Sequence, residues 1–143
     1  MQIDVILENG AKMPTKAHTS DAGFDLYMPT DARQTLLKAY DSLTIDTGVH
    51  VNIPHGFVGM LKSKSGLNVR SGIRGEGVID AGYDGSIVVK LYNDSRQDYR
   101  FDPGEKITQL VILPIPEVEL RQVEAFGTES ERGSDGFGSS GKF

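Results

Sequence analysis

The chain has 143 residues and a mass of 15.6 kDa, and its 38% hydrophobic and 24% charged residues are typical of one folded globular domain. A formal net charge of -5 argues against a surface that binds polymeric nucleic acid, although a few local cations can still hold a small anion. The absence of cysteine excludes disulfides, thiol catalysis and thiolate metal sites.

The first ten residues, MQIDVILENG, contain neither the basic region nor the cleavage pattern of a signal peptide. No apolar run in the chain approaches the roughly 18 residues of a membrane-spanning helix. We therefore expect no membrane segment and a cytoplasmic location.

Alternating polar and apolar residues predict a series of short strands along the chain. Turn sequences such as PHG (54–56) and DPG (102–104) separate them. The strand-like runs are QIDVIL (2–7), LTIDTGVHVNI (43–53), FVGMLK (57–62), GVID (77–80), SIVVKLYN (86–93), KITQLVILPI (106–115) and EVELRQV (117–123).

This pattern predicts an all-β fold, either a sandwich or a barrel. No stretch of 12 or more residues shows a clean helical stripe, which argues against alternating strands and helices. One short helix is expected near residues 67–71.

The composition changes after residue 126. Residues 127–143 contain five glycines and four serines, and such a segment cannot bury enough apolar surface to offset its ordering entropy, about 1–2 kcal/mol per residue for the backbone. We therefore divide the chain into a barrel domain, residues 1–126, and a flexible C-terminal arm, residues 127–143. A frayed terminus is the simpler interpretation of the arm, but Arg132 and Phe137 suit an arm that closes over a flat anionic ligand.

The run GVIDAGYDG (77–85) is a candidate catalytic segment. Asp80 follows a predicted strand, so its carboxylate can project into a cleft at the strand end. An aspartate that caps its own turn is the alternative. Tyr83 is either a core aromatic or a flat platform for a sugar or a base.

The run LKSKSGLN (61–68) brings two lysines, two serine hydroxyls and a glycine amide close together. These groups could neutralise and orient a phosphate. An exposed basic turn explains the same residues equally well.

Two polar residues interrupt apolar strand patterns. Asp25 lies between Phe24 and Leu26, so in a strand it faces away from both and is either solvated or turned into a polar site. Gln109 lies within an apolar run, which predicts either a partner for its amide or an outward position.

The order of these segments resembles the five ordered motifs of the trimeric deoxyuridine triphosphatase (dUTPase) family. The resemblance covers most of the chain, and the third and fifth motifs are highly specific. The matching segments are AGFDLY (22–27), KSGL (64–67), GVIDAGYDG (77–85), PGEKITQLV (103–111) and RGSDGFGSSG (132–141).

The resemblance implies a fold, an assembly and an activity. The expected fold is a distorted jelly-roll β-barrel with one short helix, and the expected assembly is a homotrimer with active sites at the subunit interfaces. The expected activity is the Mg²⁺-dependent hydrolysis of dUTP to dUMP and pyrophosphate, which keeps uracil out of DNA and supplies dUMP for thymidylate synthesis.

The match of motifs also implies roles for single residues. Asp80 would be the general base that activates water for attack on the α-phosphorus. Tyr83 would pack under the deoxyribose and leave no room for a 2′-hydroxyl. The edge of uracil would be read by the hairpin residues Gly77, Val78, Ile79 and Val88.

The remaining matched residues would handle the phosphates and the metal ion. Asp25 would reach Mg²⁺ through water, with the ion held mainly by the substrate phosphates, and Gln109 would join this network. Arg132 would contact the γ-phosphate, and Phe137 would cover the uracil ring. Further phosphate contacts would come from Lys64, Ser65, Gly66, Gly138, Ser139 and Ser140.

Some positions depart from the family pattern, and two other functions stay open. Lys64 and Lys106 stand where arginine is usual, which removes the planar guanidinium fork. A dCTP deaminase shares the fold, but Lys90 occupies the position of the glutamate that deamination needs. A dUTPase-fold regulatory protein that binds nucleotide and a protein partner is the second alternative.

Overall fold

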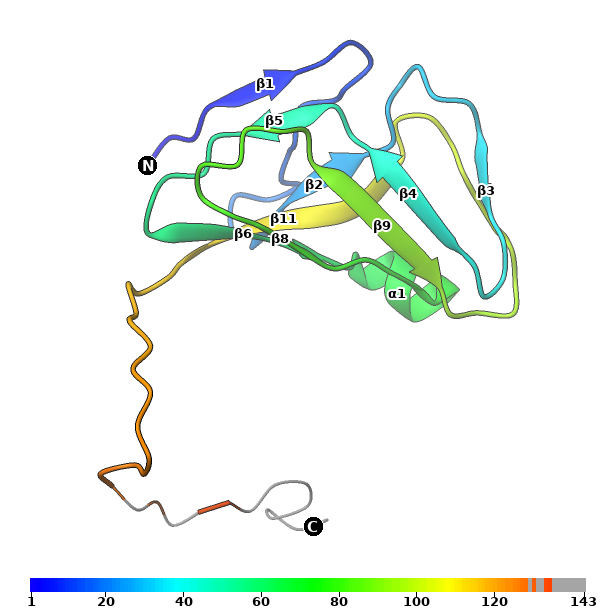
Figure 1. The fold of residues 1–143 in the computed structure, drawn as a ribbon. Helices are drawn as coiled ribbons and strands as arrows, with labels where there is room; N and C mark the ends of the chain where they lie inside the picture. Colours follow the sequence, from blue (N-terminus) through cyan, green and yellow to red (C-terminus); the bar gives the residue numbers. More distant parts are fainter. Residues whose placement is uncertain (129, 131–132, 135–143) are drawn as a thin grey trace.

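The structure is a computed structural model, and it describes residues 1–128, 130 and 133–134. Eleven strands and one helix form this part of the chain (Figure 1), which confirms the predicted all-β fold with one short helix. In chain order they are β1 (Val5–Leu7), β2 (Gly23–Tyr27), β3 (Thr35–Leu37), β4 (Ser42–Asp46), β5 (Val49–Val51), β6 (Phe57–Lys62), α1 (Ser65–Ser71), β7 (Ile73–Arg74), β8 (Gly77–Ile79), β9 (Val88–Asn93), β10 (Tyr99–Phe101) and β11 (Lys106–Pro114).

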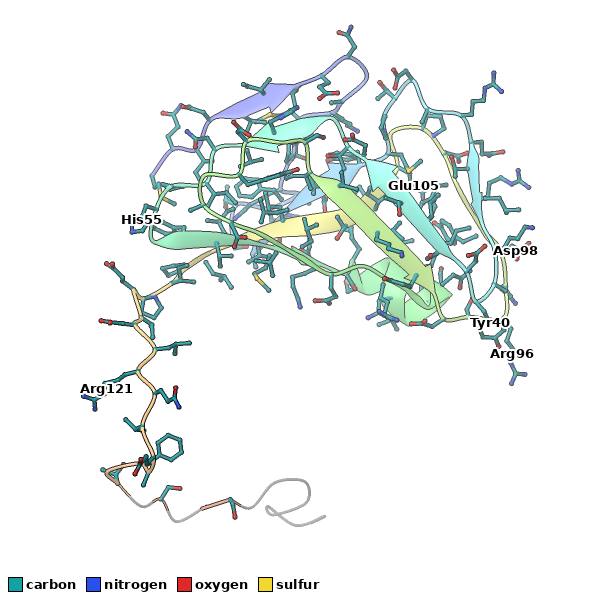
Figure 2. The ribbon with its side chains drawn as sticks, in the orientation of Figure 1. Tyr40, His55, Arg96, Asp98, Glu105 and Arg121 are labelled. Atoms are coloured by element: carbon teal, nitrogen blue, oxygen red, sulfur yellow. The ribbon has the colours of Figure 1, made fainter. Side chains whose placement is uncertain are left out.

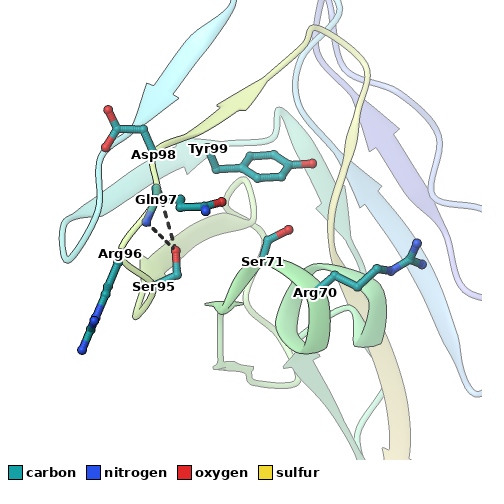
Figure 3. A pocket seen from close by; sticks show the side chains of 7 residues that line it. All are labelled: Arg70, Ser71, Ser95, Arg96, Gln97, Asp98 and Tyr99. Atoms are coloured by element: carbon teal, nitrogen blue, oxygen red, sulfur yellow. Dashed lines mark hydrogen bonds between the residues drawn. The ribbon is translucent and has the colours of Figure 1, made fainter.

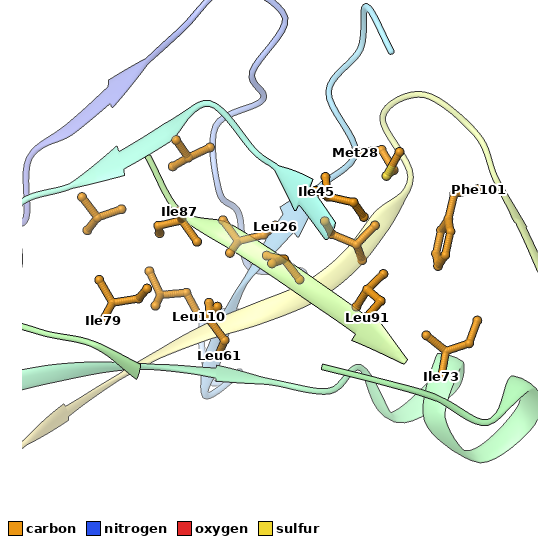
Figure 4. Close-up of a cluster of buried hydrophobic side chains, with 14 of the residues drawn as sticks. Leu26, Met28, Ile45, Leu61, Ile73, Ile79, Ile87, Leu91, Phe101 and Leu110 are labelled. Atoms are coloured by element: carbon orange, nitrogen blue, oxygen red, sulfur yellow. The ribbon is translucent and has the colours of Figure 1, made fainter. Parts of the chain in front are cut away.

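The strands form four small antiparallel sheets. The largest has the order β2-β11-β6-β8, so β8 is an edge strand. A three-stranded sheet, β4-β9-β7, and two strand pairs, β1-β5 and β10-β3, accompany it. The sheets surround one hydrophobic core (Figure 4), as expected for a distorted jelly-roll barrel.

The core consists of side chains that the strands turn inward. Leu26 of β2, Leu91 of β9 and Phe101 of β10 are almost completely buried, and each such side chain stabilises the fold by about 1.5–3 kcal/mol. Because a close-packed interior is rigid, the ends of these strands hold polar side chains in fixed positions.

The helix expected near residues 67–71 is α1. It ends at Gly72, whose φ of 66° is left-handed and whose amide bonds back to the last turn. Among the residues that the structure describes, no helix has the length and apolarity needed to span a membrane.

The strand expected at residues 117–123 does not form. Residues 115–117 still lie against the turn before β6, where the Ile115 amide donates to the Gly56 carbonyl. Residues 118–128 run away from the barrel (Figure 1), and Arg121 projects from them into open space (Figure 2). Leu120 is 92% exposed and Phe126 is 89% exposed. Polar and apolar residues alternate over 117–123 as in a half-buried strand. A strand also needs a partner for its backbone hydrogen bonds, and the described part of this single chain offers none here.

Candidate active site

An ion-pair cluster forms where β2, α1 and β11 meet. Asp25 in β2 is 5% exposed, and its two carboxylate oxygens accept hydrogen bonds from Lys64 and from Lys106, whose Nζ lies 2.7 Å from Oδ2. Burial raises the pKa of Asp25, but the bonds from Lys106 and Lys64 outweigh this effect and hold the pKa below its usual value. The same bond raises the pKa of Lys106. Two ammonium groups against one carboxylate leave one net positive charge, which attracts an anion.

Gln109 lies beside this cluster in β11. The sheet register places it opposite Asp25 of β2 and opposite Lys62 of β6. Its Nε2 donates to the Ser63 carbonyl at 3.1 Å, so the amide has a partner, as one of the two interpretations predicted. Gln109 thereby joins β11 to the segment that leads into α1.

Ser65 and Gly66 form the first turn of α1, directly after Lys64. The first amides of a helix have no partner within it, so they can donate to another acceptor. A hollow of about 400 Å³, which we call the lysine hollow, lies at this turn. Its lining residues are Lys64, Gly66, Leu67, Arg70, Ser71, Tyr99, Glu105 and Lys106.

A second hollow, of about 220 Å³, lies at the end of β8, and we call it the hairpin hollow. Gly77, the first residue of β8, precedes the lining residues in the chain. All five lining residues are among those predicted for the site: Val78, Ile79, Asp80, Tyr83 and Val88.

The Asp80 carboxylate is available for chemistry. The Asp80 backbone carbonyl accepts a hydrogen bond from the Tyr83 amide at 3.2 Å. Within residues 1–128, no hydrogen bond or ion pair involves the Asp80 side chain, so this side chain does not cap the turn. An exposed, unpaired carboxylate beside a hollow can accept a proton from water.

Tyr83 lies at the mouth of the hairpin hollow and outside the core, with 45% of its surface exposed. Its hydroxyl donates to the Ser86 carbonyl at 2.9 Å. The ring also lies against Gly85, where an added Cβ would come within 2.3 Å of the hydroxyl oxygen. These contacts hold the ring in place, which favours the platform over the core aromatic.

The two hollows lie at different ends of β6 and share no lining residue. Ile79 pairs with Gly59, whereas Gln109 pairs with Lys62, three positions further along β6. Three strand positions correspond to about 10 Å. The structure therefore groups the predicted residues into two sets and does not join these sets in one hollow of the described chain.

A third hollow, of about 330 Å³, lies between α1 and the loop that follows β9 (Figure 3). Arg70, Ser71 and Tyr99 line both this hollow and the lysine hollow, so the two adjoin. The sequence analysis did not select its residues, although the charged run DSRQD (94–98) marks the loop. Figure 3 shows the side chains of Arg70 and Arg96 pointing in opposite directions, so they do not converge on one ligand.

Five residues predicted for the site lie outside the residues that the structure describes. They are Arg132, Phe137, Gly138, Ser139 and Ser140. Their roles stay predictions.

Comparison with known proteins agrees with the resemblance of the motifs. Residues 9–141 match the sequence model of the family described as dUTPase. The chain belongs to the dUTPase family. Among curated dUTPase-family relatives, the deoxyuridine 5′-triphosphate nucleotidohydrolase of Clostridium tetani is 36% identical over 96% of this chain and 94% of its own length. The protein of the same name from Mycobacterium leprae is 39% identical over 96% of this chain and 92% of its own length.

Solved dUTPase structures from bacteriophages are similar over nearly the whole fold. The dUTPase of Staphylococcus bacteriophage 80alpha, in complex with dUpNHpp, is 36% identical with a TM-score of 0.89, and the match covers 98% of both chains. Its description states that phage dUTPases control the transfer of virulence genes. A dUTPase from phage phi11 of S. aureus, described with a structural Mg(II) ion, is 30% identical with a TM-score of 0.80 over 90% of this chain and 100% of that one.

Proposed function

We propose that this chain is a dUTP diphosphatase, which hydrolyses dUTP to dUMP and pyrophosphate. The observation that carries the proposal is the hairpin hollow, where the Asp80 carboxylate, unpaired within the described residues, lies beside an aromatic platform, Tyr83. Membership of the dUTPase family supports the same activity.

The base would bind along the outer edge of β8. In the described sheet, β8 pairs with β6 on one side only, so its other backbone edge is open. Alternate residues of an antiparallel edge strand turn their N–H and C=O groups outward, so the open groups within Gly77, Val78 and Ile79 can pair with the donors and acceptors of uracil in the way that a sheet edge pairs with a peptide. Val88 would close the opposite side of the hollow.

Asp80 and Tyr83 would act on the water and on the sugar. Asp80 would accept a proton from the water that attacks the α-phosphorus, because its oxygens have no other described partner. Tyr83 would pack under the deoxyribose, and a ring held by Ser86 and Gly85 could not move aside for a 2′-hydroxyl.

The triphosphate would bind at the lysine hollow. The cations Lys64, Arg70 and Lys106 outnumber the acids Glu105 and the adjacent Asp25, so this hollow is net positive. The first amides of α1, at Ser65 and Gly66, can donate to phosphate oxygens. Gln109 would hold the start of this segment in place through Ser63. Phosphate binding here neutralises charge that would otherwise repel the attacking water.

The donor groups fit a Mg²⁺ ion that enters with the triphosphate. No group of three or more metal-binding side chains occurs among the residues that the structure describes. In the ion-pair cluster beside the lysine hollow, the carboxylate of Asp25 already accepts bonds from two lysines. Mg²⁺ keeps several waters and binds readily through phosphates, so Asp25 would reach it through water. When bound, the ion would supply positive charge to the phosphate chain.

We further propose a homotrimer with its sites between subunits. The separation of the two hollows supports this, because one chain would offer the hairpin hollow and a neighbour the lysine hollow. The exposed apolar side chains of residues 115–128 also support it, since residues 117–123 alternate as a strand does and have no strand partner within the described part of the chain. Residues 127–143 would form an arm that closes over the site, with Arg132 on the γ-phosphate and Phe137 over the base.

A second, regulatory role is proposed from the phage relatives alone. The 80alpha dUTPase is described as controlling gene transfer, and a similar barrel could bind a protein partner when nucleotide is bound. Co-elution of the purified chain with a host protein only in the presence of dUpNHpp would support this role.

Release of pyrophosphate from dUTP, dCTP, dTTP and UTP, with and without Mg²⁺, tests the proposed function. We expect fast release of pyrophosphate only from dUTP, and only when Mg²⁺ is present. Ammonia release from dCTP is expected to be absent, because Lys90 cannot act as the acid and base of a deaminase. A chain that leaves dUTP intact in the presence of Mg²⁺ would refute the proposal.

A further inference from the structure

His50 lies in β5, and its two ring nitrogens contact two other parts of the chain. Nδ1 lies 2.7 Å from the carbonyl oxygen of Asp84, in the loop between Asp80 and β9. Nε2 lies 2.8 Å from Oε1 of Glu8, which follows β1. His50 therefore joins Glu8 to the loop that carries Tyr83.

Both partners of the His50 ring are acceptors. A carbonyl oxygen and a carboxylate oxygen cannot donate, so both ring nitrogens must donate, and only the imidazolium has two N–H groups. The charged groups placed against the ring are acidic: Glu8 and Asp46 act on it, and Asp4 and Asp84 line the same hollow. The pKa of His50 is raised above its ordinary 6.5, first by the bond to the Asp84 carbonyl and then by the bond to Glu8.

The loop of residues 81–86 has few other ties to the barrel. Within the described chain, two hydrogen bonds join it to other elements: the bond from His50 to the Asp84 carbonyl, and the bond from Ser86 to Asp46. The described hydrogen bonds of Tyr83 are local in sequence: its hydroxyl donates to the Ser86 carbonyl, and its amide donates to the Asp80 carbonyl. Ile87, directly after the loop, is anchored to the barrel by its bonds with Thr47 and Val49. Between β8 and this anchor, Ser86 would be the remaining described hydrogen bond of the loop to the barrel without His50.

We propose that His50 is a positioning residue that fixes Tyr83, and with it the choice of sugar, by holding the Asp84 carbonyl toward Glu8. This inference rests on the proposed function, because it concerns the sugar that Tyr83 would contact. A ring in a fixed loop excludes a 2′-hydroxyl, whereas a ring in a loose loop can move aside for it.

The charge of the ring makes this discrimination depend on pH. We call the bonds of the His50 ring to Asp84 and Glu8 the tether. Because the folded pKa of His50 is raised, both bonds are present below about pH 6.5, and one of the two N–H donors is lost as the pH rises through the folded pKa, which weakens the tether. The ratio of kcat/KM for dUTP to that for UTP should therefore fall about two- to fivefold between about pH 6 and pH 9. The ratio cancels titrations that affect both substrates alike, including those of the phosphates.

Three variants separate the tether from other effects. His50→Gln removes the charge and one ring donor, so its ratio should be low and independent of pH. Glu8→Gln keeps an oxygen acceptor but removes a negative charge, so the fall in the ratio should shift to lower pH. His18→Gln is the matched control, because it replaces an exposed histidine outside this network, and it should reproduce the profile of the parent chain.

The tether is also measured without nucleotide, by ¹⁵N relaxation of residues 81–86 at about pH 6 and pH 9. In the parent chain the loop should become more mobile at the higher pH, and in His50→Gln it should be mobile at both. An equally rigid loop in His50→Gln, or a sugar ratio in the parent chain that does not change with pH, would overturn the proposal. A protein that hydrolyses neither nucleotide would refute the proposed function instead, and the relaxation data would still decide whether the tether exists.

Discussion

At Asp25, one buried carboxylate holds two lysines that come from different elements. Lys64 precedes α1 and Lys106 begins β11, so their ion pairs with β2 also tie these elements together. The resemblance to the dUTPase motifs leads one to expect arginine at both positions. Each ammonium group can turn to a phosphate oxygen as a single point of charge, without the planar fork of a guanidinium group.

Asp25→Asn tests the contribution of this cluster to stability. The lowered pKa of Asp25 means that its ion pairs stabilise the fold above about pH 3.8 and are lost as the pH falls through the folded pKa. We expect the variant to be about 1–3 kcal/mol less stable at neutral pH. Urea unfolding at neutral pH checks this value. Thermal melts between about pH 7 and pH 2 should show a weaker acid dependence in the variant than in the parent chain, and equal slopes would contradict the assignment.

Asp80→Asn should abolish turnover while nucleotide binding persists, because an amide keeps the shape of the side chain but cannot accept the proton. A loss of at least about 100-fold in kcat is expected for removal of a general base. Calorimetric binding of dUpNHpp provides the control. Normal turnover by the variant would show that another group is the base.

Gly85→Ala should relax the discrimination against UTP, because the new Cβ would come within 2.3 Å of the Tyr83 hydroxyl and force the ring to move. We expect the ratio of kcat/KM for dUTP to that for UTP to fall by about tenfold or more. If Gly85→Ala keeps the ratio of the parent chain, Tyr83 does not select the sugar.

At the scale of elements, most strands and the helix were predictable, and β3, β7 and β10 were not. β11 lies within the predicted run 106–115, and α1 includes the expected residues 67–71. β3 and β10 form because each pairs with the other, a long-range contact that the pattern of one short run does not indicate. The run 117–123 has the pattern of a strand but pairs with no strand among the described residues, which the sequence pattern cannot reveal.

The site was predictable to a similar degree. The motif residues Val78, Ile79, Asp80, Tyr83 and Val88 do line one hollow. The sequence did not predict that Lys106 and Lys64 bond the same carboxylate, because that contact joins residues distant in the chain. The sequence analysis also assigned no role to His50. Its partner Glu8 becomes a neighbour only through the pairing of β1 with β5, and its partner Asp84 only through the path of the loop 81–86.

Deletion of residues 132–143 tests the proposed arm. The barrel core lies within residues 26–110, so the deletion should change the melting temperature by less than about 2 °C, as expected for the loss of no core contact. Turnover of dUTP should fall by about 100-fold or more, because the site would stay open to water. A large fall in melting temperature would contradict the division of the chain at residue 126.

At the scale of the whole molecule, the separation of the two hollows predicts complementation between inactive chains. A trimer that takes Asp80 from one subunit and Lys64 from another should regain activity when Asp80→Asn and Lys64→Ala chains are unfolded and refolded together. Random mixing should restore about a quarter of the parent activity, since each site draws its two parts independently. Refolding each variant by itself provides the control. No recovery in the mixture would place both parts of the site in one chain.

The open edge of β8 has a further consequence for the behaviour of the protein in solution. An unpaired strand edge can recruit the strand of another molecule and start aggregation. Here the exposed edge is only three residues long, and Asp80 follows it directly. Such an edge is long enough to meet the few hydrogen-bonding groups of a base, yet too short and too polar at its end to nucleate a growing intermolecular sheet.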